Sequence, residues 1–167
     1  MTYSLYDASI PVFLNALRNL AALLDKAEAH AKTSGVDVAG YLEGRLAADM
    51  HPLTRQIQMA SDAAKGGGAR LAAIAPPSYP DVETTWAEVK DRIAKTIAFL
   101  ETITVEQVAG GEDRTIELPL PGRTMTFTAA DFLARFALPN FFFHVVTAYG
   151  ILRHQGVPLG KMDYLAG

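Results

Sequence analysis

The sequence predicts an all-α fold, a four-helix bundle with a small β-hairpin inserted before the last helix. Two observations lead to this prediction. In four long segments, apolar residues recur every three or four positions, which is the spacing of an amphipathic helix with one buried face. Between the third and fourth of these segments, residues 115–127 instead alternate around a Pro-Gly pair, as two short strands and a turn do. Helices of this kind bury their apolar faces by packing together as a bundle.

Composition limits the class of protein. The 167 residues suit a single domain, residues 1–167, that is long enough to bury a substantial core. The chain has no cysteine, which excludes disulfides, thiolate nucleophiles and Cys-based zinc sites. A net charge of −3 with interspersed signs argues against nucleic acid as a partner. No apolar run approaches the roughly 20 residues of a membrane span, and no secretory signal is visible, so we expect a cytoplasmic protein without a membrane partner.

The first helix is predicted from Asp7 to about Lys32, and Pro11 is tolerated because it falls in the first turn. A connection with several glycines follows, with at most a short helix around Tyr41 to Leu46.

The second long helix is expected to begin at Pro52, with Asp49 or His51 near its cap. Three consecutive glycines, Gly66 to Gly68, fall toward its end. Each costs about 1 kcal/mol relative to alanine inside a helix. The glycines therefore indicate either a break or a very close approach of a neighbouring helix.

The third helix follows a proline-rich loop, with Asp81 as the predicted cap and an end near Ile103. The hairpin strands are expected at Thr115–Leu118 and Thr124–Phe127, joined by Pro121 and Gly122.

The last helix is expected to be capped by Thr128 and to stop at Gly156 and Pro158. Pro139 should kink it, because proline removes a backbone hydrogen bond and clashes with the preceding turn. We expect the long helices to be antiparallel, with the hairpin packed at one end.

Four stretches carry a family resemblance: SLYDASIPVF, ADMHPLTRQIQMASDAAKG, RTIELPLPGRTMTFTAADFL and ALPNFFFHVVTAYGILRHQGVPLGKMDYL. With these, the sequence resembles the DUF1993 family, a branch of the DinB/YfiT-like superfamily of four-helix bundles. In that superfamily a divalent metal, often nickel or zinc, is typically held by a His of the second helix and an HxxxH pair of the fourth. Some members transfer or isomerise substrates with low-molecular-weight thiols.

The resemblance places the HxxxH pair at Asn140 and His144, so that this chain has NxxxH. Residues four apart share a helix face and can converge on one point. An asparagine offers only a neutral amide oxygen, a poor replacement for imidazole toward zinc or nickel. The second-helix ligand stays open among His51, Asp49, Gln56 and Gln58. The metal set under consideration is His144, Asn140 and His51, and the pocket set is Asn140, His144, Asp49, Gln56 and Tyr149.

Each of these side chains also has a structural explanation. His144 lies among apolar residues and would then be a hydrogen-bonded core histidine. Asn140 would bond the carbonyls that Pro139 releases, and His51 would cap the second helix. Asp49 and Tyr149 belong to a group of polar residues that either line the bundle interior or form surface pairs of little energetic value.

Phe141, Phe142 and Phe143 cannot all face one core, because successive helical residues point 100° apart. At least one ring faces another surface, which favours a homodimer through apolar helix faces. We therefore expect a homodimeric protein that binds a small ligand or is structural and keeps a degenerate metal-site pocket. The alternative is a divalent-metal-dependent enzyme of the DinB-like type: a thiol-dependent transferase or isomerase, or a hydrolase. In both cases His144 and Asn140 should border the main pocket.

Overall fold

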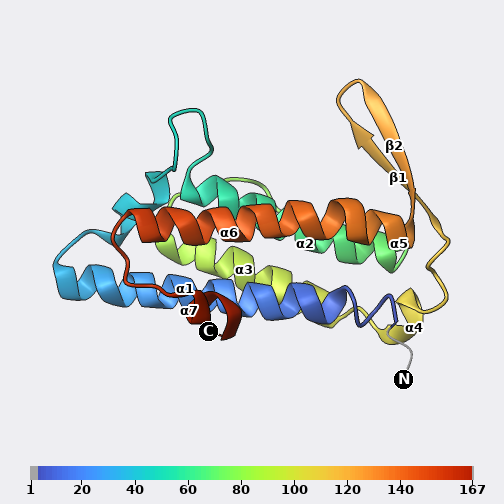
Figure 1. Ribbon diagram of the computed structural model, residues 1–167, viewed down its shortest axis with the longest axis horizontal. Coiled ribbons are helices and arrows are strands. Elements are labelled where there is room, and N and C mark those ends of the chain that lie inside the picture. Colours follow the sequence, from blue (N-terminus) through green and yellow to red (C-terminus); the bar gives the residue numbers. More distant parts are fainter. Residues whose placement is uncertain (1–3, 167) are drawn as a thin grey trace.

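The computed structural model describes residues 4–166, so the outermost ends of the predicted 1–167 domain lie outside the described part. Within that range the bundle consists of α1 (Ile10–Ser34), α2 (Leu53–Leu71), α3 (Trp86–Glu101) and α6 (Leu138–His154). Figure 1 shows them as a long stack, with the C-terminal α7 (Lys161–Ala166) lying beside α1. None of the helices within residues 4–166 combines the length and the apolar character that a membrane span requires.

The directions of the helices differ from the antiparallel arrangement that we expected. α2 and α3 run in the same direction, as two contacts show. Ser61 Oγ lies 2.6 Å from Thr96 Oγ1, and Gly68, which comes later in α2, lies against Leu100, which comes later in α3. α1 and α6 also share a direction (Figure 1). The cause is the loop of residues 72–85, which returns along the bundle and brings the chain to the same end at which α2 began.

The ends of the helices correct the sequence analysis at three places. α2 begins at Leu53 with Pro52 at its N-cap, so neither Asp49 nor His51 caps it. α1 begins at Ile10 with Pro11 in its first turn. α3 is capped by Thr85, whose hydroxyl accepts from the Glu88 backbone N–H while the Glu88 carboxylate accepts from Thr85. Asp81 is therefore not the cap, and it pairs with arginine side chains described below. The short helix near Tyr41 is a 3₁₀-helix, η1 (Val38–Glu43).

The three glycines of α2 lie inside the helix, which continues to Leu71. A Cβ at Gly68 would stand 2.7 Å from Leu100 Cδ2 and 3.2 Å from Ile10 Cδ1, and a Cβ at Gly67 would stand 3.1 Å from Phe13 Cζ. The close-approach interpretation is thus correct, because the missing side chains allow α1 and α3 to pack directly on the α2 backbone.

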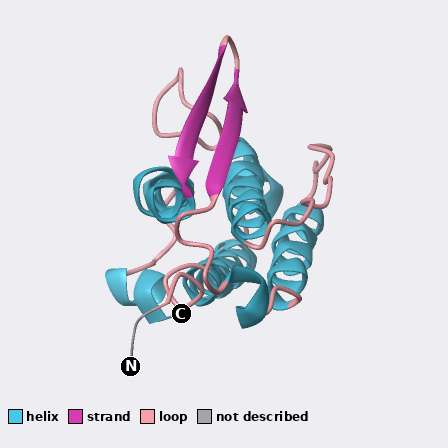
Figure 2. Ribbon diagram, turned by 90° about the vertical axis from the view of Figure 1, so that its right-hand side faces the viewer, coloured by secondary structure: helices cyan, strands magenta, loops and turns pink. Residues whose placement is uncertain are grey.

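The predicted hairpin is present as β1 (Thr115–Leu120) and β2 (Arg123–Thr128), paired in the register Thr115↔Thr128 to Leu120↔Arg123. Gly122 in the turn has φ 78°, a conformation that suits glycine. The hairpin projects from one end of the bundle in Figures 1 and 2, and its base packs there through Phe127 on Phe132. It is preceded by the short α4 (Val105–Val108), which the sequence analysis did not predict although Thr104 and Gln107 form its capping box.

The distortion expected at Pro139 takes the form of a π-helix. Thr128 caps α5 (Ala129–Phe132) as predicted, and η2 (Leu133–Ala137) then forms a π-helical segment that continues into α6. The Leu138 N–H bonds the carbonyl of Leu133, five residues earlier. The wider turn accommodates Pro139, which cannot donate a backbone hydrogen bond, and π-helical segments of this kind often occur at functional sites.

Candidate functional site

His144 is buried on the face of α6 that packs against α2, with a side chain that is 9% exposed. Its Nδ1 lies 2.8 Å from Gln56 Oε1, and Gln56 Nε2 donates to the backbone carbonyl of His51 at 3.1 Å. The carbonyl of His51 can only accept, so the Gln56 amide must direct its oxygen toward His144. The proton of the imidazole therefore sits on Nδ1, and Nε2 carries a lone pair. We call this chain of hydrogen bonds the Gln56 relay.

The environment keeps the imidazole neutral. Burial lowers the pKa of His144 below its usual value, and the positive charges of His51 and Arg55 lower it further. Within residues 4–166, His144 Nε2 has no hydrogen-bond partner. A neutral imidazole in this tautomer presents a hydrogen-bond acceptor to whatever lies beside it.

A cavity of ≈ 290 Å³ lies beside His144, between α2, the α5–η2 segment, the start of α6 and the inner face of β1. Asn140, one helical turn before His144, lines the same cavity. The remaining lining combines apolar and charged side chains: Met59, Asp62, Ala63, Gly67, Arg70, Leu118, Phe132, Phe136 and Ala137. We call this space the His144 cavity.

The structure places the other candidate residues elsewhere. Asp49 and the His51 side chain are exposed in the connection before α2, and His51 reaches the site only through its backbone carbonyl. Gln58 points to the opposite side of α2, where it bonds Glu83 and Arg55. Tyr149 packs on a tyrosine of α7, with ring centroids 5.9 Å apart. Asp49 and Tyr149 therefore do not line the His144 cavity, and Gln56 contributes by orienting His144.

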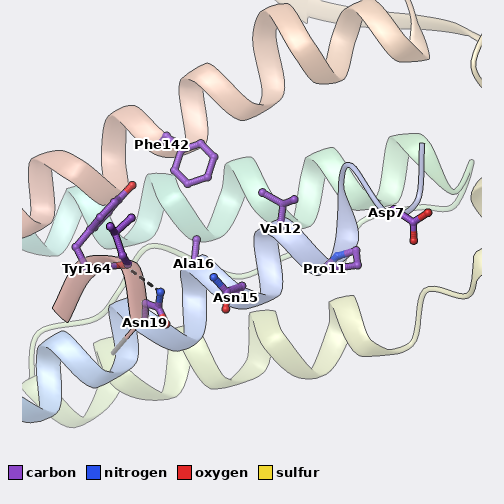
Figure 3. A pocket seen from close by; sticks show the side chains of 9 residues that line it. Asp7, Pro11, Val12, Asn15, Ala16, Asn19, Phe142 and Tyr164 are labelled. Carbon is purple, nitrogen blue, oxygen red and sulfur yellow. Dashed lines mark hydrogen bonds between the residues drawn. The ribbon is translucent and has the colours of Figure 1, made fainter. Parts of the chain in front are cut away.

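A larger cavity of ≈ 640 Å³ lies on the other side of α6, whereas His144 and Asn140 border the smaller cavity of ≈ 290 Å³. Figure 3 shows Phe142 pointing from α6 toward α1, and Val12 and Ala16 pointing from α1 toward α6. Asn19 donates to the carbonyl of Tyr164 in α7 at 3.0 Å at one end of this groove. None of the predicted site residues lines it.

The donor set of the His144 cavity does not fit a zinc or nickel site. Such sites take at least three protein ligands. Within the described residues, no three His, Asp or Glu side chains come together in a way that could hold a metal ion. The position on α2 that faces His144 is an amide, and its oxygen is already occupied by the Nδ1–H. Asn140 adds only a second amide.

A cluster of charges around the buried Arg92 side chain was missed by the sequence analysis, and its Asp62 and Asp81 carboxylates are 41% and 35% exposed. The Arg92 side chain is 1% exposed and forms ion pairs with three carboxylates: Asp62 at 2.9 Å, Asp81 at 3.0 Å and Glu83 at 3.0 Å. Asp81 also pairs with Arg55. The sequence did contain a signal for the burial of Arg92. This residue belongs to the same helical stripe as the apolar residues of α3, and that stripe faces the core.

Comparisons with known proteins agree with this architecture. The family described as "Domain of unknown function (DUF1993)" matches residues 5–165. The chain is similar to a crystal structure of a DinB family member protein from Shewanella denitrificans, with 43% identity and a TM-score of 0.88 over 98% of this chain and 92% of that chain. None of the curated proteins matches the chain. The protein is thus a member of the DUF1993 family, with the helical bundle of a DinB family protein.

Proposed function

We propose that this protein binds a small organic molecule in the His144 cavity, and that the ligand donates a hydrogen bond to His144 Nε2. The observation that carries the proposal is the Gln56 relay, which holds the proton on Nδ1 and leaves the other nitrogen without a partner. Within residues 4–166, Trp86 Nε1 is the only fully buried side-chain N or O atom without a partner, so His144 Nε2 is not fully buried and is accessible to a molecule in the cavity.

The composition of the cavity supports a small organic ligand. Ligand cavities are mostly apolar with a few convergent polar groups, and their volumes begin near 300 Å³. Here Met59 and Phe136 supply apolar walls, while Asn140 and His144 supply polar groups on one helix face. The volume of ≈ 290 Å³ favours a small molecule.

The test is a screen of small phenols and amines by ligand-observed NMR against the full chain. We expect hits that His144→Ala abolishes and that the matched control His154→Ala retains, since His154 is an exposed histidine at the end of the same helix. The absence of hits, or hits that survive His144→Ala, would contradict the proposal.

Metal analysis distinguishes the alternative of a divalent-metal-dependent enzyme. The protein would be purified without chelator and its nickel and zinc content measured beside that of His144→Ala. Stoichiometric metal that disappears in His144→Ala would favour the enzyme and contradict a metal-free ligand site. We expect no stoichiometric metal, because two amides and one imidazole make a poor donor set.

We also propose a homodimer through the outer face of α6. Phe143 is 57% exposed and Val146 is 49% exposed, and Gly150 continues the same stripe one turn later. The stripe carries no charge, so a two-fold contact of α6 with α6 is self-complementary. Leu46 of the same chain covers Gly150, with its Cδ1 3.4 Å from where a Cβ would stand, so Phe143 and Val146 carry the contact. Light scattering at tens of micromolar should show a dimer that Phe143→Ser dissociates. Val82→Ser, at an apolar residue elsewhere that is 69% exposed, should leave the dimer intact.

A further inference from the structure

The His144 cavity contains a positive charge that the proposed function does not use. Arg70 lines the cavity and donates one guanidinium N–H to the Gly66 carbonyl at 2.9 Å. It forms no ion pair with any residue in the range 4–166. The other charged lining residue, Asp62, is already balanced, because its Oδ1 pairs with Lys65 at 2.8 Å and with Arg92 at 2.9 Å. The cavity therefore presents one uncompensated cation and a neutral His144.

The backbone of α2 is shaped to hold this guanidinium. A Cβ at Gly66 would lie 2.8 Å from Arg70 Nη1, so the missing side chain is what allows the guanidinium to fold back along the helix. One N–H is fixed on the carbonyl, and the planar fork keeps further donors. Two parallel hydrogen bonds from such a fork are the geometry by which arginine recognises a carboxylate.

We propose that the ligand of the His144 cavity is a small carboxylic acid whose carboxylate is bound by Arg70. This inference rests on the proposed function and specifies its ligand class. Without an anion, the partly buried Arg70 guanidinium would be left without a counter-charge in a cavity whose histidine is neutral, which is unfavourable where polarity is low.

The polar groups of the His144 cavity lie at different positions along α2, so the ligand needs two separate polar groups. The Arg70 guanidinium lies against Gly66, and Met59 is the lining residue of α2 nearest to the Gln56 relay. At a rise of 1.5 Å per residue, these two positions are about 10 Å apart along the axis of α2. Leu118 and Phe136 line the cavity as well. The ligand class is therefore a carboxylic acid with an apolar or aromatic body and a hydroxyl group at the end away from the carboxylate.

Calorimetry on the full chain with three probes tests the inference. The probes are 3-(4-hydroxyphenyl)propanoate, the corresponding neutral amide, and 3-phenylpropanoate, which lacks the hydroxyl group. We expect the hydroxylated acid to bind about tenfold or more tightly than either of the others, because each lacks one charged or hydrogen-bonding contact.

Two variants of α2 isolate the role of Arg70. Arg70→Gln should make the acid and the amide bind alike, whereas Arg135→Gln, an exposed arginine outside the cavity, should preserve the difference. Gly66→Ala should weaken binding of the acid without lowering the stability of the protein, because its Cβ displaces the guanidinium while alanine favours the helix.

The outcomes separate this inference from the proposed function. If the acid and the amide bind equally and Arg70→Gln changes nothing, the carboxylate inference is wrong and a neutral ligand at His144 remains. If no probe binds to the wild type, the carboxylate inference is also overturned, and the fragment screen with His144→Ala decides the proposed function independently.

Discussion

The glycines of α2 give opposite expectations for the same substitution at positions two residues apart. Gly68→Ala would place a Cβ 2.7 Å from Leu100 Cδ2, 3.0 Å from Ile103 Cδ1 and 3.2 Å from Ile10 Cδ1. All three neighbours are core side chains that are at most 2% exposed, so they have little room to move. At Gly66 the Cβ would meet only the far end of Arg70, which can swing away.

The magnitudes follow from two competing terms. Alanine gains about 1 kcal/mol over glycine inside a helix, at both positions. Overpacking a closed core costs about 1–3 kcal/mol, and three close contacts at Gly68 point to the upper part of that range. We therefore expect Gly68→Ala to lose about 1–2 kcal/mol of unfolding free energy. Gly66→Ala should gain up to about 1 kcal/mol.

Urea unfolding monitored by circular dichroism measures both changes on one scale. Gly68→Ala should lower the midpoint and Gly66→Ala should raise it, with the slope m unchanged in each, since a changed m would mean an altered denatured state. Equal stabilisation by both variants would refute the conclusion that these glycines exist for helix packing. Stabilisation by Gly68→Ala alone would refute the direct contact of α2 with α1 and α3.

Two further predictions concern the buried charges. Arg92→Ala should cost about 1.5–3 kcal/mol in urea unfolding, because it removes the charge-assisted hydrogen bonds of a buried guanidinium while Asp62 and Asp81 keep Lys65 and Arg55 as partners. The exposed Arg135→Ala should stay within about 0.5 kcal/mol, and similar losses in the two would contradict the role of Arg92 in the network. Burial alone would raise the pKa values of Asp81 and Glu83. Hydrogen bonds outweigh this effect and hold both pKa values below their usual range; Arg55 and Arg92 donate to Asp81, and Arg92 and Gln58 donate to Glu83. Their contribution to stability is present above the pKa of the unfolded carboxyls, about 4, and is lost as the pH falls through the lower folded values. The urea midpoint should therefore drop more steeply below about pH 4 in the wild type than in Arg92→Ala, and parallel curves would contradict the assignment.

The fold could be predicted where its determinants are local. Helical periodicity and the Pro-Gly turn located the long helices and the hairpin, because these signals act within a few residues. The choice of Asp81 as a cap failed although Thr85 and Glu88 form the S/T-x-x-E pattern of a capping box, a local signal that was present in the sequence. The shared direction of α2 and α3 could not be read from periodicity, because it depends on the path of the connecting loop.

The candidate site was less accessible to sequence reasoning. The NxxxH spacing placed Asn140 and His144 on one face, which is a property of a single helix. The relative rotation and register of α2 and α6 determine which residue of α2 faces His144. The sequence does not give these, so four candidates stayed open. Arg70 carries no sequence signal for the site, because its entry into the cavity depends on the missing side chain of Gly66.

The measurement that tests the central claim most directly is the nitrogen chemical shifts of His144 by long-range ¹H–¹⁵N correlation NMR. Near pH 7.5 we expect a neutral ring with the proton on Nδ1, an unprotonated Nε2, and a titration midpoint below the ordinary value of 6.5. Addition of 3-(4-hydroxyphenyl)propanoate should shift the Nε2 resonance of His144 and leave that of His154 unchanged. A ring protonated on Nε2, or a charged imidazolium at that pH, would contradict the Gln56 relay and the ligand site built on it.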